Sequence, residues 1–460
     1  MKIENHSSER IKKVIVAQRE FFASGATLSY AFRLEQLKKL QATLKKWEKA
    51  LCDALWADLH KSPEEAILTE ISIVSGEVKN HIKHLKKWMS HEHRSTPLKM
   101  MPSCSRIVSE PLGNTLIISP WNYPVQLLLN PLVGAISAGC TAILKPSPYV
   151  PATSATIEKM IKESFDEKYV AVIQGNREVN SMLLDEKFDL IFFTGSPALG
   201  RKVMQAAARN LTPVILELGG KSPCIVDKEA DIKIAARRIA WGKTLNAGQT
   251  CIAPDYLLIH SSLSEKFAKA MREELKKLHG EEIHKSKNFV RMVNDRAFER
   301  VSSYLKDGRI VFGGTTIAKE RYIEPTLLAD VSPDSPVMQE EIFGPVLPMI
   351  TFNNIEEAIL FVNEREKPLA LYYFGNKKMG FEVIKRTSSG GSCINDTIMH
   401  IANENLPFGG VGNSGMGNYH GRGSFDAFSH KRAVVVTTTK LDLPFRYMPY
   451  KMFELVKKIL

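Results

Sequence analysis

The sequence predicts an α/β protein with two doubly wound units, each built on a parallel sheet. The chain has 460 residues, about three times the usual domain length, so it can form more than one core. From about residue 106, short apolar runs alternate with helical patterns. A second block of the same kind extends from about residue 222 to residue 395. Such alternation is typical of βαβ units, whose ligands bind at the carboxyl ends of the strands.

The composition is that of a globular protein. Hydrophobic residues make up 44% and charged residues 24%, which excludes a collagenous or largely disordered chain. The net charge of +12 raises the question of a nucleic-acid partner. However, the lysines are mixed with glutamates on helical patterns, and no basic run is interleaved with aromatic residues. We therefore expect no nucleic-acid partner.

Six scattered cysteines form no C-x-x-C pair, so we expect neither a disulfide framework nor a zinc site. A reducing, cytoplasmic location fits this pattern. Residues 1–13 are polar, and we expect no secretory signal there. The most apolar stretch, residues 125–144, is interrupted by polar residues and glycines, which favours a buried helix followed by a buried strand over a membrane span.

The elements follow from the apolar spacing along the chain. Leucines at three- and four-residue intervals predict a long helix across residues 34–59, and Ser62 followed by Pro63 predicts a new helix start. A last strand is expected at residues 433–439, ahead of an amphipathic tail at residues 451–460. Short apolar runs predict five earlier strands: 115–119, 141–145, 169–173, 190–193 and 214–218.

Cys251 is the first candidate for chemistry. It lies in the segment NAGQTCIAP (246–254), between a glycine and a proline that favour a turn. A thiol attacks carbon efficiently only as thiolate, so such a cysteine needs surroundings that remove its proton. The alternative is an inert, buried small residue.

Two further segments offer partners for a nucleophile. Glu217 ends an apolar run and opens into ELGGKSP (217–223); a buried carboxylate there must be used or paired, for example with Lys221. Asn122 lies between two prolines in PWNYP (120–124), where a fixed amide could donate to an oxyanion, although a plain turn is the alternative. The run FTGSPALG (193–200) joins a strand end to a helix start at Pro197, an arrangement that favours phosphate.

These segments, in this order, resemble the aldehyde dehydrogenase superfamily. The likeness continues in KPS (145–147), EEIFGP (340–345) and LPFGGVGNSG (406–415), and therefore covers nearly the whole chain. The runs CIAPDY (251–256) and SFDAFSH (424–430) resemble the shorter, class 3-like branch.

The resemblance implies a complete mechanism. Cys251 would attack the aldehyde carbonyl while Asn122 and the Cys251 backbone N–H hold the oxyanion, and hydride would leave to NAD or NADP. Glu217 would then activate the water that hydrolyses the thioester. Residues expected to contact the cofactor are Trp121, Lys145, Gly195, Ser196, Gly200, Glu341 and Phe343.

The resemblance also implies a division of the chain and a type of substrate. Two Rossmann-like domains would bind cofactor (residues 1–86 and 108–218) and carry out catalysis (219–420). A small β oligomerisation element (87–107 and 428–442) would bridge a homodimer, followed by a tail (443–460). A mostly apolar funnel formed by Tyr123, Leu127, Trp241 and His400 would favour medium-chain aliphatic or aromatic aldehydes.

One residue departs from the family's pattern. Many NAD-preferring relatives carry a glutamate after Lys-Pro-Ser, where its carboxylate binds the adenosine ribose, but this chain has Pro148. Without this glutamate, the 2′-phosphate of NADP meets no like charge, although no arginine is added to bind it. We therefore expect the enzyme to use both cofactors or to prefer NADP.

Alternatives follow from the same residues. One alternative is a coenzyme A-acylating enzyme that uses Cys251, but water activated by Glu217 would hydrolyse the thioester before coenzyme A accepted the acyl group. Another is a non-catalytic protein on this fold, which would be expected to have lost Cys251, Glu217 or Asn122. His91 and His93 could contact a metal, but no further ligands complete a site, so no metal is expected. The tail at 451–460 is expected to dock on its own dimer rather than on a membrane.

Overall fold

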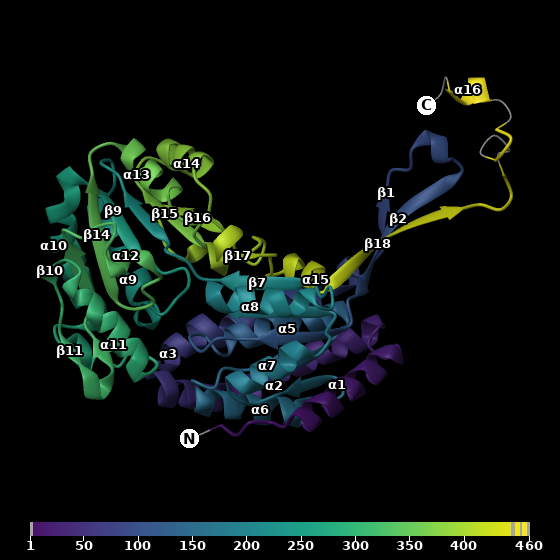
Figure 1. Ribbon diagram of the computed structural model, residues 1–460, viewed down its shortest axis with the longest axis horizontal. Helices are drawn as coiled ribbons and strands as arrows, with labels where there is room; N and C mark the ends of the chain where they lie inside the picture. Colours follow the sequence, from purple (N-terminus) through teal and green to yellow (C-terminus); the bar gives the residue numbers. More distant parts are fainter. Residues whose placement is uncertain (1–2, 443–446, 451–452, 458–460) are drawn as a thin grey trace.

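The computed structural model describes residues 3–442, 447–450 and 453–457, except for the side chains of residues 455 and 456. Two lobes, each with its own sheet, lie side by side, and a narrow β arm projects from one of them (Figure 1). The amphipathic tail expected at 451–460 falls partly outside the described residues; within it, Phe453–Lys457 form the short helix α16.

Helices form the amino-terminal part of the chain, as the leucine spacing predicts. The long helix α2 buries Leu37, Leu44 and Leu55 on one face, and α3 begins at Ser62, whose hydroxyl accepts the N–H of Glu65. The elements here are α1 (Ser8–Ala23), α2 (Tyr30–Leu59), α3 (Pro63–Ala66), the π-helical turn η1 (Ile67–Ile71) and α4 (Ser72–Trp88).

The first sheet has the strand order β17-β7-β6-β3-β4-β5, and every pair is parallel except β17 with β7. Each predicted strand is present within two residues of its predicted ends. The strands are β3 (Asn114–Ile118), β4 (Thr141–Lys145), β5 (Val170–Val172), β6 (Leu190–Gly195), β7 (Val214–Leu218) and β17 (Gly415–Met416). The helices between them are α5 (Gln126–Ala138), α6 (Pro151–Ser164), α7 (Arg177–Asp185) and α8 (Pro197–Ala208). The apolar stretch 125–144 is thus a buried helix and strand, as predicted.

The second sheet has the order β10-β13-β14-β9-β8-β15-β16, parallel except for β10 with β13. Its strands are β8 (Pro223–Val226), β9 (Tyr256–His260), β10 (Arg309–Phe312), β13 (Thr326–Ala329), β14 (Val346–Phe352), β15 (Ala370–Phe374) and β16 (Gly391–Ile394). The accompanying elements are α9 (Ile232–Thr244), α10 (Ser264–His279), α11 (Asp295–Ser303), α12 (Pro336–Gln339), α13 (Ile355–Asn363), α14 (Lys377–Arg386) and the hairpin β11 (Thr316–Ile317) with β12 (Tyr322–Ile323).

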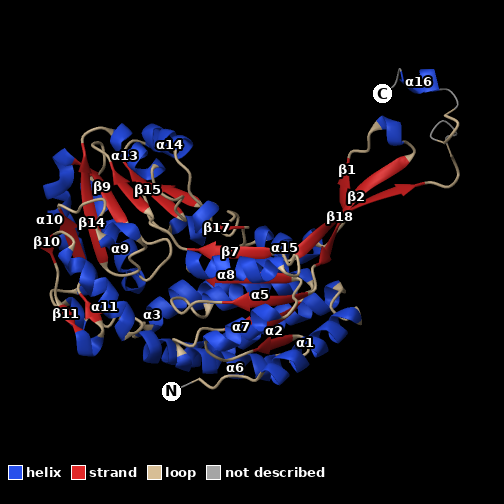
Figure 2. Ribbon diagram, viewed as in Figure 1, coloured by secondary structure: helices blue, strands red, loops and turns tan. Residues whose placement is uncertain are grey.

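The projecting arm is a three-stranded antiparallel sheet of β1 (Glu92–Arg94), β2 (Ser103–Pro111) and β18 (Ser429–Thr437) (Figure 2). Strand β18 begins four residues earlier than the predicted strand 433–439 and ends two residues earlier. Its first residues are polar and give no apolar signal. They pair with β2 through the backbone, while Arg432 bonds Glu110.

The chain returns to the first sheet near its end. Strand β17 lies within residues 219–420, the range expected to form the catalytic domain, yet it pairs with β7 and sets Gly415 opposite Glu217. Backbone pairing between two residues leaves no periodic pattern in the sequence, so this crossing between lobes could not be predicted.

Helix α5 packs closely on the start of the arm, and Gly134 permits this contact. A Cβ built there would lie 2.9 Å from the Phe428 ring and 3.0 Å from the backbone oxygen of Ser424, in α15 (Arg422–Ala427). We predict that Gly134→Ala lowers the free energy of unfolding by about 1–3 kcal/mol, the usual cost of overpacking.

The matched control is Gly76→Ala, inside α4, where an added Cβ meets nothing within 4 Å. It should stabilise the protein by up to about 1 kcal/mol through helix propensity. Urea unfolding of both variants measures the difference; a stabilising Gly134→Ala would contradict the close packing.

Candidate functional site

The carboxyl ends of three neighbouring parallel strands bring the first-lobe candidates to one edge. Glu217 in β7 pairs in register with Thr194 of β6, and β6 lies beside β3, which leads into the loop that carries Asn122. This edge is where ligands bind in doubly wound sheets.

Cys251 comes from the second lobe, between η3 (Leu245–Gly248) and β9. The backbone of this loop is strained: Asn246 and Ala247 have φ of +52° and +53°. Gly248 has φ of +74°, and a Cβ there would collide with the backbone of Gly344, so only glycine fits. The turn leaves Cys251 partly exposed, as its flanking glycine and proline suggest.

Asn122 reaches across to this loop. It is 2% exposed, and its side-chain nitrogen donates to the backbone oxygen of Gln249 at 3.0 Å, two residues before Cys251. An amide nitrogen carries two N–H groups, so one remains to donate elsewhere.

Glu217 is buried without a partner. Neither of its carboxyl oxygens has a hydrogen bond to any residue that the structure describes. The alternative of a salt bridge to Lys221 is wrong, because Lys221 bonds Asp255 instead. Burial raises the pKa of Glu217 well above its usual range. A buried, unpaired carboxyl group costs stability, which is consistent with the role predicted for Glu217.

Electrostatics link these groups. Burial raises the pKa of the Cys251 thiol, and the carboxyl groups of Glu341 and Glu217 raise it further. The thiol is therefore within electrostatic range of both carboxyl groups, although the three residues are far apart in the sequence.

Several residues expected to bind cofactor lie near the same edge. The rings of Trp121 and Phe343 meet edge to face with centroids 5.3 Å apart. Glu341 lies over Gly219, where a Cβ would collide with its carboxyl group, and burial raises its pKa to about 8. Lys145 is buried at the end of β4, and burial lowers its pKa to about 7.

The turn from β6 to α8 has the predicted form. Ser196 caps α8 by accepting the N–H of Leu199, and Pro197 occupies the first turn. A Cβ at Gly200 would lie 2.7 Å from Leu218, so glycine lets the helix approach β7. Gly195 similarly lies against the Phe193 ring.

The predicted funnel residues come from both lobes. Tyr123 Oη and Thr250 Oγ1 are 2.7 Å apart. Leu127 lies one helical turn after Tyr123, and its backbone N–H donates to the backbone oxygen of Tyr123. Trp241 is partly buried in α9. His400 lies against Tyr372, whose hydroxyl donates to the oxygen of Ile252 at 2.5 Å.

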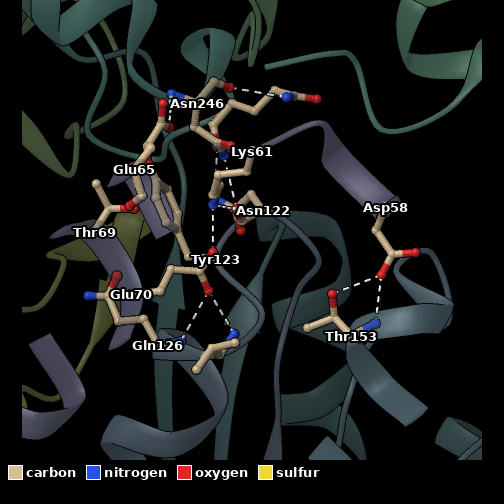
Figure 3. A network of polar contacts seen from close by, with 12 residues as sticks. Asp58, Lys61, Glu65, Thr69, Glu70, Asn122, Tyr123, Gln126, Thr153 and Asn246 are labelled. Carbon is tan, nitrogen blue, oxygen red and sulfur yellow. Dashed lines mark hydrogen bonds and ion pairs between the residues drawn. The ribbon is translucent and has the colours of Figure 1, made fainter. Parts of the chain in front are cut away.

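Sequence reasoning missed several neighbours of the site. Thr250 and Tyr372 contact it directly, and Asn246, Gln249 and a group of charged residues at 61–70 hold it (Figure 3). Asn246, Gln249 and Thr250 lie in the segment 246–254 that the sequence already indicates, but no local pattern marks Tyr372 or the charged residues at 61–70.

The fit to NAD or NADP is supported by buried polar atoms. Glu341 Oε1 and Thr194 Oγ1 have no hydrogen-bond partner within the described part of the chain, and both lie at the edge that carries Glu217. The amino-terminus of α8 begins directly after β6 at this edge, which suits a pyrophosphate. No group of three or more His, Cys, Asp or Glu side chains in the described ranges could hold a metal ion.

The family model for the aldehyde dehydrogenase family matches residues 1–434. The chain belongs to this family. The resemblance found in the sequence segments is thereby confirmed, including its class 3-like branch, since family 3 members are among the similar proteins.

Similar proteins extend over nearly the whole chain. The 4,4'-diaponeurosporen-aldehyde dehydrogenase of Staphylococcus aureus is 47% identical over 96% of this chain and 97% of its own. The dimeric NADP-preferring aldehyde dehydrogenase of Canis lupus familiaris is 46% identical over 96% and 98%. A substrate-bound structure of Staphylococcus aureus AldH, 46% identical, superposes with a TM-score of 0.96 over 98% of this chain and 99% of that one.

The protein is therefore an enzyme that oxidises aldehydes with NAD or NADP, and the non-catalytic alternative is set aside. The α/β fold with parallel sheets agrees with the prediction. Within the described ranges, no helix is long and apolar enough to cross a membrane.

Proposed function

We propose that Cys251 is the nucleophile of this aldehyde dehydrogenase, that Asn122 and the Cys251 backbone N–H bind the oxyanion, and that Glu217 is the general base. The observation that carries the proposal is the meeting of a partly exposed thiol with a buried, unpaired carboxyl group and an amide donor from a different lobe.

In the first half-reaction, the Cys251 thiol loses its proton to water, its sulfur bonds the aldehyde carbon, and the carbonyl oxygen becomes an oxyanion. Asn122 donates to that oxygen with the N–H that Gln249 does not occupy. NAD or NADP, when bound, supplies the hydride acceptor that converts this adduct to a thioester. Trp121, Lys145, Glu341 and Phe343 would hold the cofactor beside the thiol.

In the second half-reaction, Glu217 accepts a proton from water as the water oxygen attacks the thioester carbon. The C–S bond breaks, the carboxylic acid leaves, and Glu217 passes the proton that it took from water to the sulfur. The unpaired oxygens of Glu217 suit this role, because no other described residue competes for them. This base also argues against the coenzyme A-acylating alternative, since water would consume the thioester first.

We predict that Glu217→Gln retains a burst of reduced cofactor, about one per site, but loses at least about 100-fold of steady turnover, because hydride transfer precedes the hydrolysis that needs the base. Stopped-flow absorbance of reduced nicotinamide measures both phases. The control, Cys251→Ala, should lose burst and turnover together. An equal fall of burst and turnover in Glu217→Gln would assign the carboxyl group to an earlier step.

We further propose that the enzyme uses both cofactors or prefers NADP. Pro148 follows the Lys-Pro-Ser segment in the loop between β4 and α6, and brings no carboxylate to the adenosine ribose. The similar canine enzyme is named NADP-preferring, which supports the proposal.

We predict that Pro148→Glu shifts the ratio of kcat/KM values toward NAD by roughly tenfold, because a charged contact of this kind is worth about 1.5–3 kcal/mol. Steady-state kinetics with both cofactors measures the ratio. Pro148→Ala separates the carboxylate from the loss of proline itself, which frees φ and restores an N–H. The same shift in both variants would show that residue 148 does not face the ribose.

For the substrate, we propose medium-chain aliphatic or aromatic aldehydes. Tyr123, Leu127 and Trp241 offer apolar surface, and burial lowers the pKa of His400 to about 4, so it carries no charge at neutral pH. We predict kcat/KM values for octanal and benzaldehyde at least tenfold above that for succinic semialdehyde. Equal values would contradict an apolar funnel; the aldehyde named in the Staphylococcus aureus relative belongs in the same panel.

We also propose a homodimer and a cytoplasmic location. The arm carries exposed apolar side chains, Val435 and Val436 on β18 with Leu98 and Met101 beside it, which a second copy could cover. The canine relative is named dimeric. All six cysteines are free thiols, which suits a reducing compartment.

A further inference from the structure

A short segment after α2 lies beneath both loops of the site. Lys61 precedes α3, Glu65 lies in α3, and Glu70 lies in the π-helical turn η1. In Figure 3, Lys61 points toward Asn122, Glu65 toward Asn246, and Glu70 toward Lys61 and the backbone at Gln126. π-Helical turns often occur at functional sites. This one places the carboxylate of Glu70 in contact with Lys61.

Lys61 and Glu70 form an ion pair of 2.6 Å whose two side chains are 0% exposed. Removing both charges from water is expensive, and a buried pair is often no better for stability than well-packed apolar residues. The presence of a buried ion pair here is therefore better explained by the backbone groups that Lys61 and Glu70 also bind than by a gain in stability.

The pair holds the loop of Asn122 at both ends. Lys61 Nζ donates to the backbone oxygen of Asn122 at 3.1 Å and lies 4.2 Å from the centroid of the Tyr123 ring. The second oxygen of Glu70 accepts the backbone N–H groups of Val125 at 2.8 Å and Gln126 at 3.4 Å. These N–H groups begin helix α5, which has no side-chain cap from Val125 itself.

The same segment holds the loop that leads to Cys251. Glu65 Oε1 accepts the backbone N–H of Asn246 at 2.8 Å, in the strained part of that loop. The side-chain nitrogen of Asn246 donates at 3.0 Å to the backbone oxygens of both Asn122 and Gln249. Asn122 is thus fixed through its main chain and through its side chain to the same loop.

We propose that Lys61, Glu65 and Glu70 are positioning residues, which set the amide of Asn122 against Cys251 so that its free N–H meets the developing oxyanion. The proposal rests on the oxyanion role assigned to Asn122 above. A donor stabilises a transition state only when it is fixed in place before the reaction, to within about 0.5 Å, and a buried network of hydrogen bonds supplies that rigidity.

The test compares two reactions of the same thiol without cofactor. With p-nitrophenyl acetate, the sulfur attacks the ester carbonyl, an oxyanion forms, and p-nitrophenolate leaves an acetylated Cys251. With iodoacetamide, the sulfur displaces iodide from a saturated carbon and no oxyanion forms. We expect Glu70→Gln to lower the acetylation rate constant at least tenfold and to change the alkylation rate of Cys251 less than twofold.

An equal fall of both rates would overturn the proposal, because it would mean that the thiol itself was disturbed. Unchanged acetylation would overturn it as well. If Glu70→Gln does not fold, the double variant Lys61→Met/Glu70→Gln removes both charges together and leaves no unpaired charge buried. The same comparison of rates then applies.

A double-mutant cycle with Asn122→Ala separates this inference from the function it rests on. Asn122→Ala alone should lower acetylation by about 10²–10³, the usual loss for one oxyanion donor. No loss would refute the assigned role of Asn122. In the Asn122→Ala background, Glu70→Gln should change acetylation less than twofold; an equal factor in both backgrounds would show that Glu70 acts elsewhere.

Asp58 provides a matched control in the same region. Its carboxylate accepts the backbone N–H groups of Ala152 at 3.1 Å and Thr153 at 2.7 Å at the start of α6, as Glu70 does at α5 (Figure 3). Asp58→Asn should lower the thermal midpoint and leave both rates within twofold of the parent. A tenfold loss of acetylation in this control would overturn the proposal, since any weakened helix start would then suffice.

Discussion

The hydrogen bond from the Asn122 side chain to the backbone oxygen of Gln249 joins two loops that belong to different lobes. One loop follows β3 in the first sheet, and the other precedes β9 in the second. Each lobe has its own sheet, and this contact, with that between Asn246 and the backbone oxygen of Asn122, joins the loop of the thiol to the loop of its amide partner. The geometry of the site therefore depends on how the two loops are fastened to each other.

Several ionisable side chains are withdrawn from solvent around the loops of Asn122 and Cys251. Glu217, Lys61 and Glu70 are buried, and Glu341 is half-buried. Burying such groups lowers stability unless they are paired. The two kinds of burial differ. The Lys61–Glu70 pair is satisfied by protein atoms, whereas the oxygens of Glu217 have no hydrogen-bond partner among the described residues. A catalytic site needs groups that hydrogen bonds hold in place, and it also needs reactive groups that stay free of such bonds.

The close approach of backbone segments gives a second constraint. Gly248 lies against the backbone of Gly344, and Gly219 lies beneath the Glu341 carboxyl group. The segments EEIFGP and NAGQTCIAP are therefore in contact because glycine removes the side chains between them. A side chain at Gly219 would displace Glu341, and one at Gly248 would displace the loop of Cys251. The glycines of these sequence motifs therefore lie where segments of the chain pack tightly.

The five parallel strands of the first sheet, the buried stretch at 125–144 and the segments that carry Cys251, Glu217 and Asn122 can be predicted from the amino-acid sequence. Those features are local: apolar runs set strands, and glycine and proline set turns. Two other features become visible only in the folded chain: β17 pairs with β7 and places Gly415 opposite Glu217, and Lys61 and Glu70 bind the loop of Asn122. These are contacts between residues far apart in the chain or made through backbone atoms, and neither kind leaves a periodic or compositional pattern for sequence reasoning to find.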